Sequence, residues 1–225
     1  MMLRLAAAAL GISFSLVSAM LFADSLRSRP AIAAAASVVA DPQSWRGSGD
    51  TLDRYLSEQP LPGRCNRDGE RSLVILELTR LDLLAADKSV SPLRLEQLRS
   101  GALARARHAL ACAPQDGGSW LYLAMLQQAS GERRAEILHS LQLSRRFAPN
   151  AAFVLKQRLR FAGRLWSAEI NGPRDPLGDL IVDDLTVLAE AGSLSDRKAI
   201  VAVLGPKIAP LLERVRSAAA LSDAQ

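Results

Sequence analysis

The chain contains few of the residues that most often carry out chemistry. Its 225 residues include only two histidines and two cysteines. His108 and His139 have neither a cysteine nor an acid at the spacing of a metal site, so no bound metal is expected. The sequence also lacks a phosphate-binding glycine loop, a nucleophile elbow and a zinc helix with two histidines. We therefore expect no catalytic residue and no cofactor, and we do not predict an enzyme.

Aromatic residues are scarce as well, at 4% of the chain. Alanine and leucine dominate and runs of β-branched residues are few, which favours helices over sheets. The sequence therefore predicts an all-α fold. The formal net charge of +5 suits nucleic acid, an anionic membrane or an acidic polymer. An arginine-rich composition gives the same charge without any such partner, so charge alone identifies none of them.

An uncharged run of 19 residues occupies residues 5–23. As a helix this run would be roughly 28 Å long, close to the hydrocarbon thickness of a bilayer, about 30 Å. We predict an N-terminal transmembrane helix that acts as a signal anchor over residues 1–23. A cleaved signal peptide is the alternative, with the sequence VSA at Val17–Ala19 as its cleavage site.

Two cysteines indicate how this anchor is oriented. Basic residues flank the uncharged run on both sides, so the positive charges alone do not decide the orientation. Cys65 precedes one expected helix and Cys112 ends the next, so a helical hairpin would bring the two residues close together. A disulfide between them would persist only in an oxidising compartment, and two unrelated thiols are the alternative. The pairing favours a single-pass inner-membrane protein with a periplasmic body.

Capping residues mark where the two helices of the hairpin between Cys65 and Cys112 begin. Asp68 can cap a helix that continues through GERSLVILELTRLDLLAAD. Ser91 can cap the next helix, because Pro92 fits its first turn. That second helix runs to Cys112.

Helix-ending prolines recur 35 residues apart, at Pro114 and Pro149. Between them a new helix opens at Trp120, and Gly131 lies in the turn before the next one. A tryptophan that opens the first helix and a proline just after the second resemble the tetratricopeptide repeat. The resemblance implies antiparallel helical hairpins that stack, share a core and leave a concave surface for a partner protein.

The resemblance covers residues 71–166, and its best unit is 117–149. Two residues in that unit depart from the family's pattern. Gln127 stands where a tyrosine is usual in the first helix, and Ile137 stands where the second helix usually has a small alanine.

Changes in composition, together with helix-capping and helix-breaking residues, divide the chain into four segments. The anchor is followed by a stretch rich in alanine, serine, proline and glycine, which predicts a flexible tether, with a short helix over TLDRYLSEQ (residues 51–59) as an alternative for part of it. Towards the C-terminus, Asp175 and Ser195 can each cap a helix that closes the array. The predicted boundaries are 1–23 for the anchor, 24–67 for the tether, 68–170 for the tetratricopeptide-like hairpins and 171–225 for the C-terminal helices.

Charge is unevenly distributed over the second half of the chain. Basic residues concentrate between residues 133 and 164, whereas acids are in excess between 175 and 196. The two groups could attract one another, or each could be a solvated helix face. The basic group could also face an anionic polymer, lipid headgroups or an acidic partner. The expected partner-binding residues are Arg133, Arg134, Arg145, Arg146, Lys156, Arg160 and Arg164.

The expected function is a membrane-anchored cell-envelope scaffold or accessory protein whose helical hairpins bind a partner protein. That partner would belong to a membrane or envelope complex, in an assembly, secretion or polysaccharide system. Membrane contact is predicted through residues 5–23. The alternative is a module whose basic face binds an anionic polymer or a phospholipid surface. Nucleic acid is not an expected partner, because the sequence contains no recognition motif for it.

Overall fold

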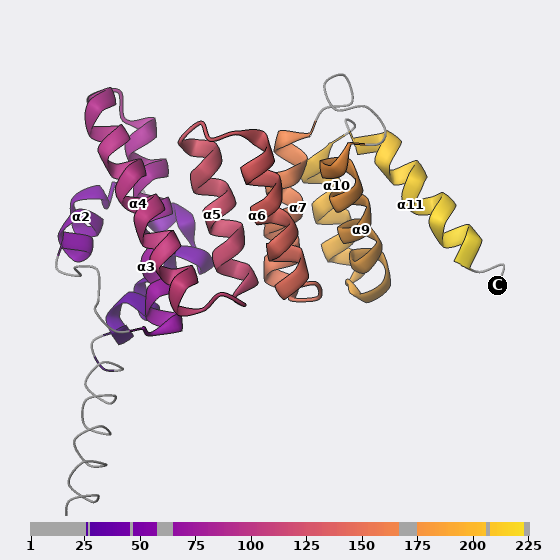
Figure 1. The fold of residues 1–225 in the computed structure, drawn as a ribbon, viewed down its shortest axis with the longest axis horizontal. Coiled ribbons are helices and arrows are strands. Elements are labelled where there is room, and N and C mark those ends of the chain that lie inside the picture. Colours follow the sequence, from indigo (N-terminus) through magenta and orange to yellow (C-terminus); the bar gives the residue numbers. More distant parts are fainter. Residues whose placement is uncertain are drawn as a thin grey trace, which may run out of the picture. The chain divides into compact units, whose positions relative to one another are not determined.

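The computed structural model describes four stretches of the chain, and every regular element within them is a helix (Figure 1). The predicted all-α class is therefore confirmed. The predicted anchor over residues 1–23 lies outside the described residues. Within the described stretches no helix is both long enough and apolar enough to cross a membrane. The described residues are 26–57 without 27 and 46, 65–166, 175–205 and 208–222.

The chain divides into two compact units, Met1–Pro114 and Gln115–Gln225. We refer to them as the first and the second unit. The boundary between them falls inside the segment 68–170, which the sequence predicted as one hairpin array. In the first unit, a helix over residues 28–40 is followed by η1 (Pro42–Trp45), α2 (Gly49–Ser57), α3 (Arg67–Ala86) and α4 (Pro92–Cys112).

The predicted flexible tether over 24–67 is wrong for the part that the structure describes. Ala31, Ala35 and Val38 recur at helical spacing and are at most 5% exposed. They pack in one apolar cluster with Leu52 of α2 and Leu73 of α3. The stretch is helical because this apolar face has a surface to bury against, which an alanine-rich composition alone does not reveal.

The α3–α4 hairpin is the centre of the first unit. Asn66, and not the predicted Asp68, caps α3 by accepting a hydrogen bond from the backbone N–H of Gly69. Ser91 caps α4 as predicted, and Pro92 occupies its first turn. The two helices pack against each other along their lengths.

The hairpin brings Cys65 and Cys112 together in a disulfide, with their Cα atoms 5.1 Å apart. Of the two alternatives that the sequence left open, the structure contains the pairing. The sequence separation of 47 residues makes the closed loop long. In the chain-entropy model such a loop corresponds to a stabilisation of about 4 kcal/mol.

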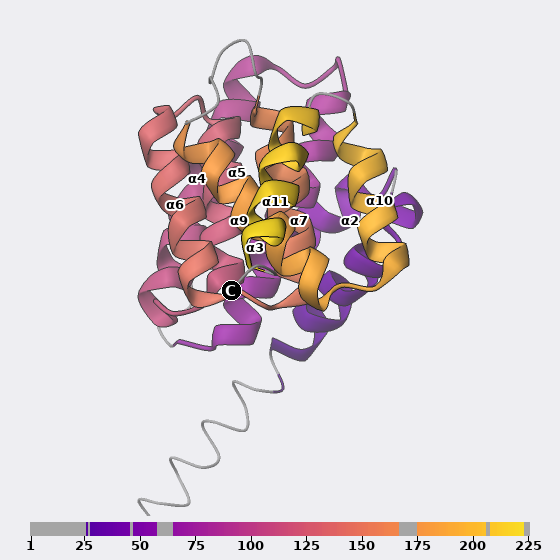
Figure 2. The ribbon, with the colours of Figure 1, turned by 90° about the vertical axis from the view of Figure 1, so that its right-hand side faces the viewer.

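The second unit consists of helices that pack side by side (Figures 1 and 2). The predicted hairpin over 117–149 is present as its first two helices. Asp116 caps the first of them by accepting hydrogen bonds from the backbone N–H and the hydroxyl of Ser119. Gly131, with φ of +70°, makes the turn between them. The helices are α5 (Gly117–Ala129), α6 (Arg134–Phe147), α7 (Ala152–Leu165), α9 (Pro176–Ala191), α10 (Leu194–Leu204) and α11 (Ala209–Ser222).

Contacts at the helix ends show how these helices run. Successive helices are antiparallel: Gly117 at the start of α5 lies against Ala148 at the end of α6. Alternate helices are parallel, because Lys156 of α7 contacts Asp196 of α10 near their starts and Gly163 contacts Leu204 near their ends. As a result α5, α7 and α10 form one layer, and α6, α9 and α11 form the other.

One apolar cluster fills the space between the two layers of the second unit. Leu141, Leu159 and Ile181 are fully buried within it. Burying a side chain of this size contributes about 1.5–3 kcal/mol, so the cluster is the main stabilising element of the unit. Aromatic side chains of the predicted repeat join it at Phe161 and Trp166.

Gly117 provides a test of the close approach between α5 and α6. A Cβ atom at this position would lie 2.5 Å from the Cβ of Ala148 and 2.7 Å from the carbonyl oxygen of Ser144. Because backbone atoms form this contact, Gly117→Ala should lower the free energy of unfolding by about 1–3 kcal/mol, measured by urea denaturation. The control is Gly101→Ala in the interior of α4, where nothing lies within 4 Å of the added Cβ. That substitution should raise the free energy of unfolding by about 0.5–1 kcal/mol. Equal effects of the two substitutions would contradict the packing.

Candidate functional site

The basic residues predicted to bind a partner lie on α6 and α7, and several of them pair with acids of their own unit. Arg134 of α6 is 2.9 Å from Asp175, the residue that caps α9. Lys156 of α7 is 3.0 Å from Asp196 of α10. Arg133, which precedes α6, donates hydrogen bonds to Glu136. These three side chains therefore have their charge balanced within the second unit.

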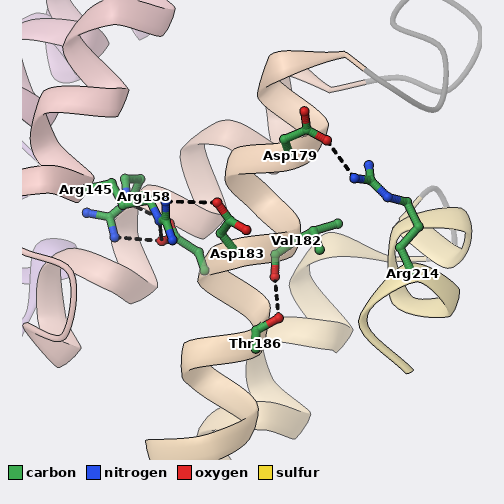
Figure 3. A network of polar contacts seen from close by, with 8 residues as sticks. Arg145, Arg158, Asp179, Val182, Asp183, Thr186 and Arg214 are labelled. Carbon is green, nitrogen blue, oxygen red and sulfur yellow. Dashed lines mark hydrogen bonds and ion pairs between the residues drawn. The ribbon is translucent and has the colours of Figure 1, made fainter. Parts of the chain in front are cut away.

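Arg145 is the fourth of these side chains and the one most enclosed by acids. Its Nη1 lies 2.9 Å from Asp183, and its Nε lies 3.6 Å from Asp184 (Figure 3). Both acids lie on α9, in the segment whose excess of negative charge the sequence showed. One of the alternatives that the sequence left open, attraction between the basic and acidic segments, is thus present in the structure.

The three remaining predicted residues are Arg146, Arg160 and Arg164. In the part of the chain that the structure describes, none of them forms an ion pair with an acid. The guanidinium carbon of Arg146 lies 5.9 Å from the centre of the Phe147 ring. Arg164 has the same arrangement over Phe161, also at 5.9 Å. These three are therefore the predicted residues whose charge is not balanced by an acid of the described chain.

A buried ion pair joins α7 to α9. Arg158 donates from Nε to one carboxylate oxygen of Asp184 at 2.6 Å and from Nη2 to the other at 2.8 Å. Both side chains are fully buried. The remaining guanidinium nitrogen donates to the hydroxyl of Ser144 at 3.2 Å and to the carbonyl oxygen of Ala148 at 3.4 Å. The pair therefore also fixes the end of α6.

Neither Arg158 nor Asp184 was predicted to have a role of its own. They belong to the basic segment 133–164 and the acidic segment 175–196, which were predicted only as groups of charge. The usable signal was position: Asp184 stands three residues after Ile181 and four before Leu188, on the apolar face of α9.

The ionisation of Asp184 reflects two opposing effects. Burial raises the pKa of its carboxyl above the ordinary value for an aspartate. The hydrogen bonds and charge of Arg158, together with the charge of Arg145, act against this rise. The guanidinium of Arg158, which stays protonated, donates a hydrogen bond to each of the two carboxyl oxygens. The pair is a structural contact, and no substrate-accessible acid or base results from it.

A groove with a volume of about 500 Å³ lies between α6 and α9. One wall carries guanidinium groups and the other carries carboxylates, and the Arg145–Asp183 ion pair joins the two walls. Figure 3 shows Asp179 turned away from this pair, toward Arg214 of α11, at 2.6 Å. The groove therefore presents both hydrogen-bond donors and hydrogen-bond acceptors. Its lining residues are Gln142, Arg145, Arg146, Pro149, Pro176, Asp179, Leu180 and Asp183.

The first unit contains a second buried polar cluster, next to the disulfide. Glu70 of α3 is 2% exposed, and burial raises the pKa of its carboxyl while the charges of His108 and Arg105 act against the rise. Nε2 of His108 lies 3.8 Å from Glu70 and 3.7 Å from the sulfur of Cys112. His108 is therefore packed between the two helices, whereas His139, in the second unit, is exposed. These side chains lie at the same end of the α3–α4 hairpin as the disulfide.

Substitutions at Asp184 test the buried pair. Asp184→Asn leaves the Arg158 guanidinium buried without a counter-charge, so the free energy of unfolding should fall by about 3–5 kcal/mol in urea denaturation. Asp183→Asn is the matched control, and its loss should stay below about 1 kcal/mol because that side chain is 48% exposed. The double variant Arg158→Met with Asp184→Leu should recover most of the loss. Equal losses at Asp183 and Asp184 would rule out the buried pair as the main contact.

No protein-family model, no curated protein and no solved structure matches this chain. Its function is therefore inferred from its own helices, charges and cavities.

Proposed function

We propose that this chain is a membrane-anchored cell-envelope scaffold protein whose stacked, tetratricopeptide-like hairpins bind a partner protein. The observation that carries the proposal is the regular alternation of helices in the second unit. There α5, α7 and α10 lie in one layer, while α6, α9 and α11 lie in the other. In this proposal the packed pairs α5–α6 and α7–α9 are successive hairpins of a stack. Stacks of hairpins offer extended surfaces to polypeptide partners. The final helices serve as the cap of the stack.

The distribution of charge favours a protein partner over an anionic polymer. Four of the seven predicted basic residues, including Arg134 and Lys156, are balanced by acids of the same unit. A polyanion gains most of its binding energy from uncompensated positive charge. The groove between α6 and α9 instead presents donors and acceptors together, which matches the backbone and side chains of a polypeptide.

The disulfide supports an envelope location for the body. A bond between Cys65 and Cys112 persists in an oxidising compartment such as the periplasm. The uncharged run over residues 5–23 supplies the proposed anchor in the inner membrane. A periplasmic scaffold with such an anchor suits an assembly, secretion or polysaccharide system, where several envelope components must be held together.

Two measurements on the full chain in its native cells test the proposal. Alkaline phosphatase fused to the C-terminus should be active, because this enzyme works only after export. A photo-crosslinking amino acid at Gln142, which is exposed and lines the α6–α9 groove, should give one reproducible crosslinked protein band.

Lys88, an exposed residue in the α3–α4 turn, is the control position for the crosslinker and should give no such band. An inactive phosphatase fusion would overturn the periplasmic location. The absence of any specific crosslink from Gln142 and from other exposed positions on the second unit would overturn the scaffold role.

A further inference from the structure

The helix over residues 28–40 is apolar on two sides. Ala31, Ala35 and Val38 face the rest of the first unit and are buried there. On another side Ile32 is 36% exposed and Val39 is 41% exposed. These two residues are seven apart and therefore share a face. A helix that is apolar all round is normally covered on all sides. In the described part of the chain, other residues bury only the side with Ala31, Ala35 and Val38.

Beyond Arg29, this helix has no charged side chains that could shield its second apolar side from water. No charged residue occurs between Arg29 and Asp41. Ala36 is exposed and lies four residues after Ile32, so it continues the same face. We define this outer face as Ile32, Ala36 and Val39. It is a strip of aliphatic side chains open to solvent in an otherwise well-packed unit.

The chain that precedes the helix indicates what covers the outer face. The uncharged run ends at Ala23, five residues before the described helix begins, and Arg27 and Arg29 lie in between and at the start of the helix. Arginine side chains near the end of a membrane-spanning helix extend to the headgroup region of the bilayer. Arg29 precedes Ala36 by seven residues, so it lies at the membrane-proximal end of the outer face.

Pro30 permits the change of direction that such a contact needs. A proline in a helix has no N–H to bond the carbonyl four residues earlier, and the helix can bend there. A bend at Pro30 lets the following helix lie along the bilayer instead of continuing the axis of the anchor. An interfacial helix of this kind buries its apolar face about 5–10 Å into the boundary between headgroups and acyl chains.

We propose that the outer face of the helix over 28–40 rests on the phospholipid surface next to the anchor and fixes the first unit against the membrane. This inference rests on the proposed function, in which residues 1–23 anchor the chain. A second copy of the chain is the competing occupant. Three aliphatic side chains provide far less than the roughly 1,200 Å² that a stable protein interface buries, so the lipid surface is favoured.

The test uses the full chain reconstituted in vesicles of phosphatidylcholine and phosphatidylglycerol. An environment-sensitive fluorescent amino acid replaces Val39, and the vesicles contain lipids with a nitroxide quencher near the headgroup. We expect blue-shifted emission at position 39 that the nitroxide lipids quench. The matched control is the same probe at Leu93, a large apolar residue of the first unit that is 72% exposed and should not be quenched.

A charge variant adds a second readout. Ile32→Glu in the chain with the probe at position 39 should abolish the quenching while the chain still unfolds cooperatively on heating, at a somewhat lower temperature because Ile32 is only 36% exposed. Leu93→Glu in the same background should leave the quenching intact.

Three results would overturn the inference, and they have different meanings. If the chain sediments with the vesicles but the probe at position 39 is not quenched, the lipid contact is wrong and the anchor stands. If energy transfer between labelled copies replaces the lipid quenching, a second copy covers the outer face. If the chain does not sediment with the vesicles, both the anchor and the lipid contact are wrong.

Discussion

A buried guanidinium needs a counter-charge, and this constraint organises the second unit. Asp184 provides the counter-charge and accepts a bidentate pair of hydrogen bonds from Arg158. The third guanidinium nitrogen of Arg158 donates a hydrogen bond to the hydroxyl of Ser144. The pair therefore ties α6, α7 and α9 to one another at a single point inside the apolar core. Apolar burial provides most of the stabilisation, but it is not directional. The ion pair is directional, because both carboxylate oxygens of Asp184 and the hydroxyl of Ser144 accept hydrogen bonds from the one guanidinium group of Arg158.

The same constraint explains how the basic segment is used. Asp183 and Asp184 of α9 face α6 and α7, and Asp175, which caps α9, pairs with Arg134 of α6. Asp179 of α9 pairs instead with Arg214 of α11. Charge that looked available for a polyanion is largely compensated within the second unit. A groove between α6 and α9 is open to solvent, and basic, acidic and apolar side chains all line it. This distribution of charge is the reason why we propose a polypeptide partner and not an anionic polymer.

Local signals in the sequence predicted much of the fold, whereas features that depend on packing were missed. Ser91 and Asp175 were correct as caps because each directly precedes a proline in the first helical turn. The expected cap Ser195 is wrong by two residues, since Ser193 nearby can fill the same role. The helix over 28–40 was missed because its alanines resemble a linker until a packing partner is known. Arg158 was missed because counting charges ignores which face of a helix each charge occupies.

The most direct test of the account is the hydrogen exchange of arginine side chains in an NMR spectrum. If Arg158 and Asp184 form the buried pair that aligns the second unit, the Nε–H of Arg158 should exchange with water far more slowly than that of any exposed arginine. Arg164, whose side chain is exposed, is the internal reference. Exchange at Arg158 as fast as at Arg164 would show that its guanidinium is in water, and the proposed organisation of α6, α7 and α9 would be wrong.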